Sequence, residues 1–575
     1  MLNPNRFVAC ATLFGIAGLI GALHAQGRGG SEWTTSGYDA QRTGWVRTDP
    51  RISPQAMIKP GDFGAFKFLW KLKLEHDPKA ATTLTPPVLL DRIIGFRGFK
   101  SVAFVATASE TVHAIDYDFG TPLWKYHINY TASLPPVTIG TADCPAGLTA
   151  ALSRPTPFAI PAAGGRGGGG GGGGAQSGGG VGEPGRGSVT LANAGRGRGG
   201  PLAPAAPGAP PANAGAAPAA AGAAPGSAAA AAGNQPGGLP GGARQGGAGG
   251  GGGGGGRGGG FQPGGDAAYV VGSDGYLHAL NVQNGWDNMT PALFIPSNTR
   301  ASGLIVASSD AGAVAYAATL RKCGSQPDAV WAMDLADAQK PVTAFKVGDA
   351  TITGGAGPSI GHDGTVFIAT AAGPAAQSST LFALEAKTLK QKEAAKVPDA
   401  AFSSSPLVFT WKDKDAVLVA GGGKIYVFDP AALAAGPIAT SAPFGTPAFE
   451  IGSLASWTDV AGVRWIAAAS PRGIVAFKLT EQGGKPAFEM GWTSPEIAAP
   501  LPPLVVNGVL FAASSGTRAL PGVLFALDAA TGKQLWTSGR AITSTIRGGL
   551  SAGGGTVFVP GSDSTLYAFG FEIEK

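Results

Sequence analysis

The stretch Val523-Leu524-Phe525-Ala526-Leu527-Asp528-Ala529-Ala530-Thr531-Gly532-Lys533-Gln534-Leu535-Trp536 combines a strand, a turn and the start of a second strand. Its first part is a short apolar run, its Asp and Thr-Gly make a turn, and Leu-Trp begins the next strand. The four-residue heart, Leu524 to Leu527, occurs eight times along the chain. The third residues of the eight copies are Ala114, Ala279, Ala332, Ala383, Val427, Ala476, Ala526 and Ala568.

These copies recur with the spacing of propeller blades. Successive third residues are 165, 53, 51, 44, 49, 50 and 42 residues apart. A strand-rich repeat of this length is typical of β-propellers and other repeat folds. One four-stranded blade cannot bury both of its faces, so the copies must pack face to face around an axis. The sequence therefore predicts an all-β fold, a single eight-bladed β-propeller.

The last blade lacks an outer strand of its own. No Leu-Trp strand follows the final copy, which ends at Phe569. The run Phe68 to Leu74 lies before the strands of the first blade and alternates apolar and basic residues from Trp70 onward, as a half-exposed strand does. We predict that this N-terminal strand closes the last blade beside Leu566 to Phe571, which removes an open sheet edge.

The first spacing is long because residues 161–263 consist almost entirely of Gly, Ala and Pro with isolated Arg. Such a stretch cannot bury enough apolar surface to offset its ordering entropy, so we expect a disordered insert within blade two. The expected organisation is a signal peptide at 1–25, an extended segment at 26–65, the closing strand, blade one and the start of blade two at 66–160, the insert at 161–263, and the remaining propeller at 264–575.

The N-terminus has the layout of a secretory signal. Arg6 precedes an apolar run from 7 to 23, and a small-residue site ends at Ala25, after which we expect cleavage. An uncleaved membrane anchor is the alternative, because a run of about 17 apolar residues approaches a spanning length. Gly and Ala dilute the run, which favours cleavage. We expect a periplasmic or secreted monomer with no membrane span after cleavage.

The formal net charge of +6 does not indicate a nucleic-acid partner. Residues 161–263 carry six arginines against one glutamate, and Arg6 leaves with the signal, so the rest of the chain is neutral. The insert also has no interleaved aromatic residues for base stacking. We therefore expect no nucleic acid among the partners.

Two cysteines, Cys144 and Cys323, remain after signal cleavage. One disulfide between adjacent blades is one interpretation for an exported chain, and two unrelated buried thiols is the other. The bridge requires Cα atoms within about 7 Å. No Cys-x-x-Cys motif and no metal-ligand spacing of histidines is present, so the sequence predicts no metal site.

Five tryptophans stand near the starts of outer strands: Trp70, Trp124, Trp286, Trp492 and Trp536. Their regular recurrence predicts packing between blades rather than a ligand cage. Two Gly-x-Ser-x-Gly patterns, centred on Ser359 and Ser551, each lead into a strand, whereas a nucleophile elbow needs a helix after the serine. We interpret both as turns of the repeat.

The function of a propeller resides in the funnel at its axis, which the inner strands line. The candidate lining is mainly hydroxyls with two arginines, Arg300 and Arg547. Guanidinium groups pair bidentately with carboxylates, so such a lining suits a small acidic ligand. In the other interpretation the hydroxyls satisfy backbone groups and water. The hydroxyl residues are Thr83, Thr85, Ser302, Thr351, Thr353, Ser403, Ser404, Ser405, Ser453, Ser456 and Ser544.

The segment Trp33 to Gly44, with its Asp39-x-x-Arg42-Thr43-Gly44 motif, resembles the entry segment of pyrroloquinoline quinone (PQQ) repeat propellers, including quinoprotein alcohol dehydrogenases. With the eight repeats, the resemblance covers nearly all of the chain outside the signal and the insert. For an active enzyme it implies PQQ stacked on a Trp, Ca²⁺ held by Glu, Asn and Asp, an Asp base and often two adjacent cysteines. This chain departs from that pattern, since it has no Cys-Cys pair and few carboxylates near the inner strands.

The resemblance leaves two hypotheses. In the first, the protein is an exported, non-catalytic scaffold without a certain cofactor, which binds an unknown protein or a small acidic ligand at its funnel. Similar propellers of this kind include an outer-membrane assembly lipoprotein. In the second, it is a PQQ-dependent dehydrogenase that uses Ca²⁺ and oxidises an alcohol or a sugar. The missing cysteine pair and calcium set favour the first.

Overall fold

The computed structural model describes residues 32–59, 64–75, 84–95, 98–128, 147–157, 267–309, 312–321, 323, 326–372, 378–398 and 400–572. All of them belong to one compact unit, and a second unit, residues 188–261, lies outside the described part of the chain. The predicted signal peptide, the insert at 161–263, Thr83 and Cys144 also lie outside it.

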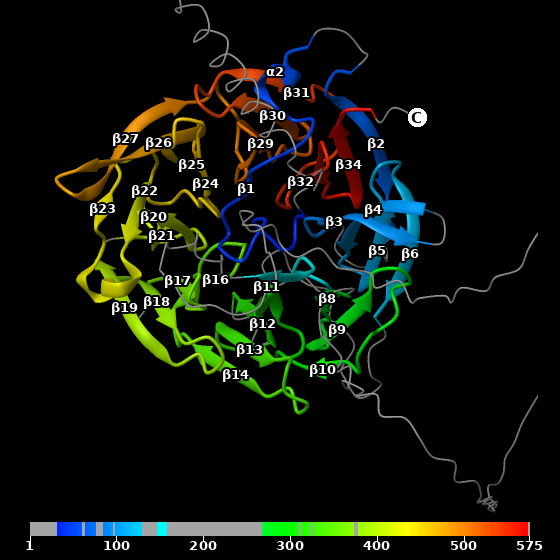
Figure 1. Ribbon diagram of the computed structural model, residues 1–575, viewed down its shortest axis with the longest axis horizontal. Coiled ribbons are helices and arrows are strands. Elements are labelled where there is room, and N and C mark those ends of the chain that lie inside the picture. The colour runs from blue at the N-terminus through cyan, green and yellow to red at the C-terminus, as the bar shows by residue number, and fades with distance from the viewer. Residues whose placement is uncertain are drawn as a thin grey trace, which may run out of the picture. The chain divides into compact units, whose positions relative to one another are not determined.

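The described residues form eight β-sheets arranged as the blades of a propeller (Figure 1), which confirms the predicted fold. Blades one and two contain β3 (Val88–Gly95), β4 (Gly98–Ala106), β5 (Thr111–Asp116) and β6 (Thr121–His127), then β8 (Ala267–Val271), β9 (Tyr276–Asn281) and β10 (Ala292–Leu293). Blade three contains β7 (Pro155–Pro157), β11 (Arg300–Ser309), β12 (Gly312–Leu320), β13 (Ala329–Asp334) and β14 (Val342–Lys346). Blade four contains β15 (Thr351–Ile352), β16 (Ser359–Ile360), β17 (Val366–Ala371), β18 (Ser378–Leu384) and β19 (Gln391–Pro398).

The second half of the ring has the same construction. Blade five contains β20 (Leu407–Trp411), β21 (Lys414–Gly421), β22 (Lys424–Phe428) and β23 (Ala439–Thr440), and blade six contains β24 (Ala455–Thr458), β25 (Arg464–Ser470), β26 (Gly473–Gln482) and β27 (Lys485–Thr493). Blade seven contains β1 (Trp45–Val46), β28 (Leu504–Val506), β29 (Val509–Ser514), β30 (Val523–Asp528) and β31 (Gln534–Thr537). Blade eight contains β2 (Lys67–Lys73), β32 (Ser551–Gly553), β33 (Thr556–Pro560) and β34 (Thr565–Gly570). The described helices are α2 (Pro54–Met57), capped by the Ser53 hydroxyl, and the 3₁₀ helix η4 (Pro430–Ala435).

The predicted closure of the last blade is confirmed. Strand β2 pairs antiparallel with β34, with a register from Lys67 opposite Gly570 to Lys73 opposite Thr565. Blue β2 therefore lies beside red β34 in Figure 1. A strand from the start of the chain thus becomes the outer strand of the final sheet and covers the edge of β34 that would otherwise be open.

The two described flanks of the insert meet in blade two. Ser153, before the insert, forms a two-way backbone bridge with Tyr269 of β8, with N–O distances of 3.0 and 2.7 Å. Immediately after Ser153, β7 pairs in parallel with β11 of blade three. The insert thus interrupts blade two without changing the number of blades, as the spacing predicts.

The core consists of interfaces between neighbouring blades. One buried cluster combines Leu407 and Leu418 of blade five with Ile466 and Phe477 of blade six. The small third residue of the repeat is buried at these interfaces, for example Ala114 and Ala526, each with 0% of its surface exposed. Small side chains let adjacent sheets approach closely, so the packing explains why the repeat keeps a small residue at this position.

Three of the five recurring tryptophans connect one blade to the turn of the next. The indole Nε1 of Trp70, Trp124 and Trp492 donates to the carbonyl of Tyr117 (2.9 Å), Val282 (3.0 Å) and Ala529 (3.0 Å), respectively. In each case a glycine of the receiving turn lies so close that a Cβ atom would stand within 2.6 Å of the indole ring. The glycines are Gly120, Gly285 and Gly532.

The prediction of packing is wrong for Trp286, which is 74% exposed. Packing tryptophans Trp124 and Trp536 stand ten residues after the small residue of their blade, but Trp286 stands only seven residues after Ala279. Met289 occupies the tenth position and packs against the core between blades two and three. Trp286 therefore lies in the turn rather than in the outer strand.

Candidate functional site

The protein's own N-terminal chain runs along the inner strands that surround the axis of the propeller. Residues 32–52, here called the axial segment, hydrogen-bond to all eight blades. Five of its carbonyls accept backbone N–H groups of inner strands at 2.8–2.9 Å: Trp33 from Leu89, Ala40 from Ile360, Gln41 from Val408, Thr43 from Ser456 and Gly44 from Val505. Three further bonds reach the remaining blades, two, three and eight. The Thr34 carbonyl accepts the Arg154 N–H (2.8 Å), Thr35 Oγ1 donates to the Leu304 carbonyl (2.6 Å), and Asp49 Oδ2 accepts the Gly555 N–H (2.9 Å).

Arg42 holds the axial segment between blades three and four. Its Nη2 donates to the Gly303 carbonyl (2.8 Å), its Nε to the Pro358 carbonyl (3.0 Å) and its Nη1 to Thr35 Oγ1 (2.9 Å) and to the Ser36 carbonyl. The residue is 2% exposed, and burial lowers the pKa of its guanidinium to about 9. Because most of its N–H groups donate to backbone carbonyls, the Arg42 guanidinium crosslinks the backbone and is not available to bind an anionic ligand.

The predicted ring of hydroxyls is directed largely at the backbone. Thr353 Oγ1 donates to the carbonyls of Ala369 (3.2 Å) and Ser404 (2.9 Å), and Ser405 Oγ accepts from the Ala356 N–H (3.0 Å). Thr85 Oγ1 accepts from the Ala106 N–H at 3.0 Å. These bonds correspond to the second interpretation of the ring, in which hydroxyls satisfy the inner strands and their loops. Ser551 of the Gly-x-Ser-x-Gly pattern behaves likewise, donating to the Pro87 carbonyl at 2.7 Å.

The two predicted anchor arginines lie in different blades. Arg300 is the half-buried first residue of β11 in blade three, and Arg547 is exposed in the loop that leads to β32 in blade eight. Blades one and two separate them along the rim. Their role as anchors stays a prediction.

Arginines do gather at Trp45, which sequence reasoning did not single out. The guanidinium carbons of Arg47 and Arg464 lie 5.0 and 5.7 Å from the Trp45 ring centroid, and that of Arg464 also lies 5.2 Å from the Phe409 ring. Burial lowers the pKa of Arg464 to about 10, and the nearby charge of Arg47 acts in the same direction. Residues far apart in sequence form this cluster, so only the fold reveals it.

Cys323 is part of a disulfide. Its predicted partner, Cys144, lies outside the described residues, so the pairing of these two cysteines stays a prediction. Within the described ranges, no group of three or more His, Cys, Asp and Glu side chains could hold a metal ion.

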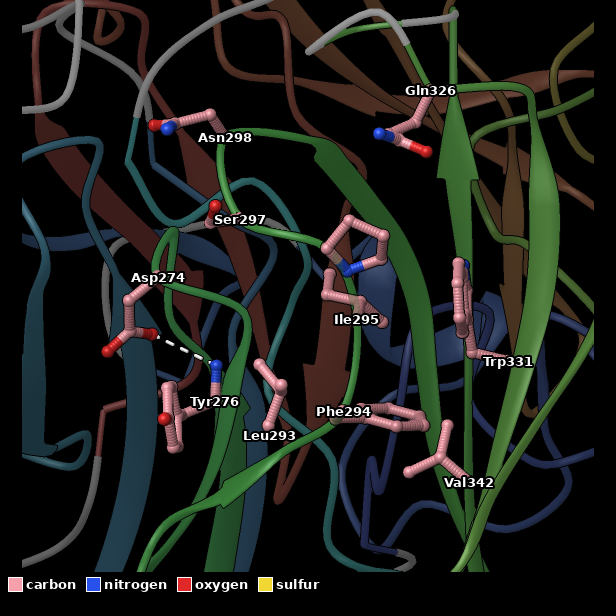
Figure 2. Close-up of a pocket in the computed structure, with 11 residues that line it drawn as sticks. Asp274, Tyr276, Leu293, Phe294, Ile295, Ser297, Asn298, Gln326, Trp331 and Val342 are labelled. Atoms are coloured by element: carbon pink, nitrogen blue, oxygen red, sulfur yellow. Dashed lines mark hydrogen bonds between the residues drawn. The ribbon is translucent and has the colours of Figure 1, made fainter. Parts of the chain in front are cut away.

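An open pocket of about 670 Å³ lies away from the axis, between blades two and three. Its size is in the range of small-ligand pockets. Figure 2 shows Trp331 along one side, the amides of Asn298 and Gln326 at one end, and apolar side chains at the other. The lining residues are Asp274, Tyr276, Leu293, Phe294, Ile295, Pro296, Ser297, Asn298, Gln326, Trp331 and Val342.

The turn beside the pocket requires its Asp-Gly sequence. Gly275 has φ +87°, and a Cβ atom there would lie 2.1 Å from the Ile295 carbonyl oxygen. Asp274 Oδ1 accepts from the Tyr276 N–H at 3.0 Å, as drawn in Figure 2. The Asp-Gly pair is a common turn sequence, but nothing in the sequence indicates a pocket, because its other wall comes from the next blade.

Comparison with known proteins finds a family model that resembles part of the repeat region. Residues 360–538 match the family model PQQ_2, described as "Outer membrane protein assembly factor BamB". These residues therefore resemble PQQ-like repeats, and the described chain has the fold of an eight-bladed β-propeller. Among curated protein sequences, none matches this propeller.

Solved structures resemble the described propeller at the level of the fold. Quinohemoprotein alcohol dehydrogenase ADHIIG from Pseudomonas putida HK5 matches with a TM-score of 0.53 and 11% identity, over 95% of this chain and 81% of that chain. A europium-containing methanol dehydrogenase matches with a TM-score of 0.51 and 10% identity, over 94% and 98%. BamB from Moraxella catarrhalis has a TM-score of 0.35 and 15% identity, over 53% and 94%, which is too low to support an argument.

Among the described residues, the axis does not fit the PQQ and Ca²⁺ that the resemblance to quinoprotein dehydrogenases implies, because no group of three or more His, Cys, Asp and Glu side chains could hold the metal. The axial segment is hydrogen-bonded to the inner strand of one blade after another, and the buried guanidinium of Arg42 donates to carbonyls and a hydroxyl of the protein.

In the described part of the chain, no helix is long and apolar enough to cross a membrane.

Proposed function

We propose that this PQQ-like propeller is a non-catalytic binding scaffold exported to the periplasm or the cell exterior. The observation that supports a scaffold is the axial segment, whose hydrogen bonds reach every blade. A segment that holds the axis in this way stiffens the ring and leaves recognition to the faces and the grooves between blades. The off-axis pocket is the clearest such place in the described structure.

Export is supported by the N-terminal sequence and by the family. The signal-like layout through Ala25 predicts secretion. The matching family model is described as an outer membrane protein assembly factor. An interaction role at the cell envelope therefore agrees with both, and the partner we expect is a protein or a small ligand.

A PQQ-dependent dehydrogenase acting on an alcohol or a sugar is the second candidate. It is favoured by the titles of the two solved structures with TM-scores above 0.5, both alcohol-oxidising enzymes. Their identities of 10–11% support the fold alone, and the axial residues described above do not fit the cofactor.

A turnover assay distinguishes the two candidates. The purified mature protein is incubated with PQQ and either Ca²⁺ or Eu³⁺, and dye-linked oxidation of ethanol, methanol and glucose is followed. We expect no oxidation above a protein-free control, because no described carboxylate cluster is available to hold the metal and take the substrate proton. PQQ-dependent turnover with either metal would replace the scaffold with the dehydrogenase.

A further inference from the structure

The pocket between blades two and three is built from two chemically different walls. The apolar wall contains Phe294, 1% exposed, together with Leu293 and Val342, which are 58% and 37% exposed. Trp331 stands beside it on β13, where its Nε1 donates to Thr319 Oγ1 at 3.1 Å. That bond fixes the orientation of a half-buried indole whose ring forms one side of the pocket in Figure 2.

The opposite end of the pocket carries hydrogen-bonding groups. Asn298 is positioned by a backbone bond to Ser273 (2.8 Å) and by a left-handed conformation with φ +57°, which Asn tolerates well. Within the described residues, the side chains of Ser297, Asn298 and Gln326 have no hydrogen-bond partner of their own. Together they supply both donors and acceptors, since each amide carries one carbonyl oxygen and one NH₂ group.

Charge narrows the ligand class. None of the described lining residues is basic, so they offer no cation to a phosphate or a carboxylate. The carboxylate Asp274 is 4% exposed and already accepts the Tyr276 N–H, so it is committed to the turn rather than presented to a ligand cation. A neutral ligand fits this lining best.

The polarity of the pocket lining restricts the class of ligand further. A purely apolar ligand that covered the pocket would strip water from Asn298 and Gln326 and leave their amides unpaired, which is unfavourable. A purely polar ligand would leave the Trp331 face and the exposed Leu293 in water. The lining therefore matches a neutral molecule with one apolar face and a polar edge.

We propose that this pocket binds a neutral carbohydrate, with the C–H face of a pyranose ring against Trp331 and its hydroxyls bonded to Asn298 and Gln326. The volume of about 670 Å³ accommodates more than one sugar ring, so a disaccharide or the end of a glycan is the expected ligand. This proposal rests on the proposed function, in that it gives the binding scaffold a ligand class and a place.

Saturation-transfer NMR on the full mature protein, without PQQ, tests the proposal with cellobiose and maltose as probes. We expect saturable binding of at least one disaccharide. Trp331→Ala and the double variant Asn298→Ala/Gln326→Ala should each weaken it by about tenfold or more, which corresponds to about 1.4 kcal/mol. Trp286→Ala is the matched control, because Trp286 is an exposed tryptophan of blade two outside the pocket lining.

The double variant changes only loop side chains, so it keeps the test valid if Trp331→Ala unfolds, and melting curves verify the fold of each protein. Three results would overturn the proposal: no binding of either disaccharide, equal loss in Trp286→Ala, or binding of the tripeptide Gly-Phe-Gly at the pocket in place of the sugars. Each leaves the turnover assay unaffected, so failure of the sugar site and failure of the scaffold function remain distinguishable.

Discussion

Replacing Arg42 by Ala removes the side chain that fastens the axial segment to blades three and four. The buried carbonyls of Gly303 and Pro358 lose their donors at 2.8 and 3.0 Å, and Thr35 Oγ1 loses the donor at 2.9 Å. A buried acceptor left unpaired costs about 1–3 kcal/mol, and part of that loss is offset because a charge no longer has to be buried. We therefore expect Arg42→Ala to lower the free energy of unfolding by about 3 kcal/mol.

Urea unfolding of purified protein measures this effect, with limited proteolysis to show where the chain first opens. Arg42→Lys should lose nearly as much, because one ammonium group cannot replace a fork that reaches two blades. Arg47→Ala is the control: Arg47 is exposed and lies over the Trp45 ring without fastening two blades, so its loss should cost less than about 1 kcal/mol. If Arg42→Ala and Arg47→Ala are equally stable, or if cleavage does not begin near the axial segment, the anchoring role of Arg42 is refuted.

Four further predictions concern stability and covalent structure. Burial lowers the pKa of His113 to about 4, so the unfolded state takes up a proton at this residue first as the pH falls below the ordinary pKa of 6.5. The free energy of unfolding should therefore fall between pH 6.5 and 4, by up to about 3 kcal/mol. His113→Phe, which introduces the residue found at the matching positions Phe382 and Phe525, should flatten that part of the pH profile in urea titrations. Trp70→Ala should cost about 3 kcal/mol in thermal and urea unfolding, whereas Trp286→Ala should stay within about 0.5 kcal/mol, and similar losses would contradict the docking of Trp70 on the Tyr117 turn. Free-thiol counting on the denatured, unreduced mature protein should find none, and Cys144→Ser should release one thiol at Cys323; a free thiol count of two in the wild type would reject the bridge. Deletion of residues 164–260 should change the unfolding free energy by less than about 2 kcal/mol, and a larger loss would show that the insert packs on the propeller.

Local repetition explains why the fold was predictable. The repeat around Ala526 contains the strand, the turn and the small buried residue of each blade, so its eight copies specify eight sheets. The missing outer strand after Phe569 was enough to assign β2 to the last blade, because an open edge is unfavourable. Trp286 was misassigned because it stands seven residues after Ala279, whereas the packing position, ten residues after the small residue, is occupied by Met289.

The candidate sites were less predictable because they depend on contacts between distant segments. The resemblance identified Arg42 as part of an entry motif, but only the structure shows its bonds to Gly303 and Pro358, more than 250 residues away. The pocket likewise joins Asn298 of one blade to Trp331 of the next. Hydroxyl residues in the inner strands suggested a polar funnel, while in the structure Thr353 bonds backbone carbonyls.

Equilibrium dialysis of PQQ against the mature protein, with Ca²⁺ and in parallel with Eu³⁺, tests the central claim most directly. The claim is that the axial segment, held by Arg42, bonds the inner strands of the blades, so that they are not available to hold a cofactor at the axis. We predict no saturable binding at micromolar PQQ with either metal, and no change on addition of an alcohol or a sugar. Stoichiometric binding of PQQ that depends on Ca²⁺ or Eu³⁺ would contradict the claim and favour a quinoprotein enzyme instead.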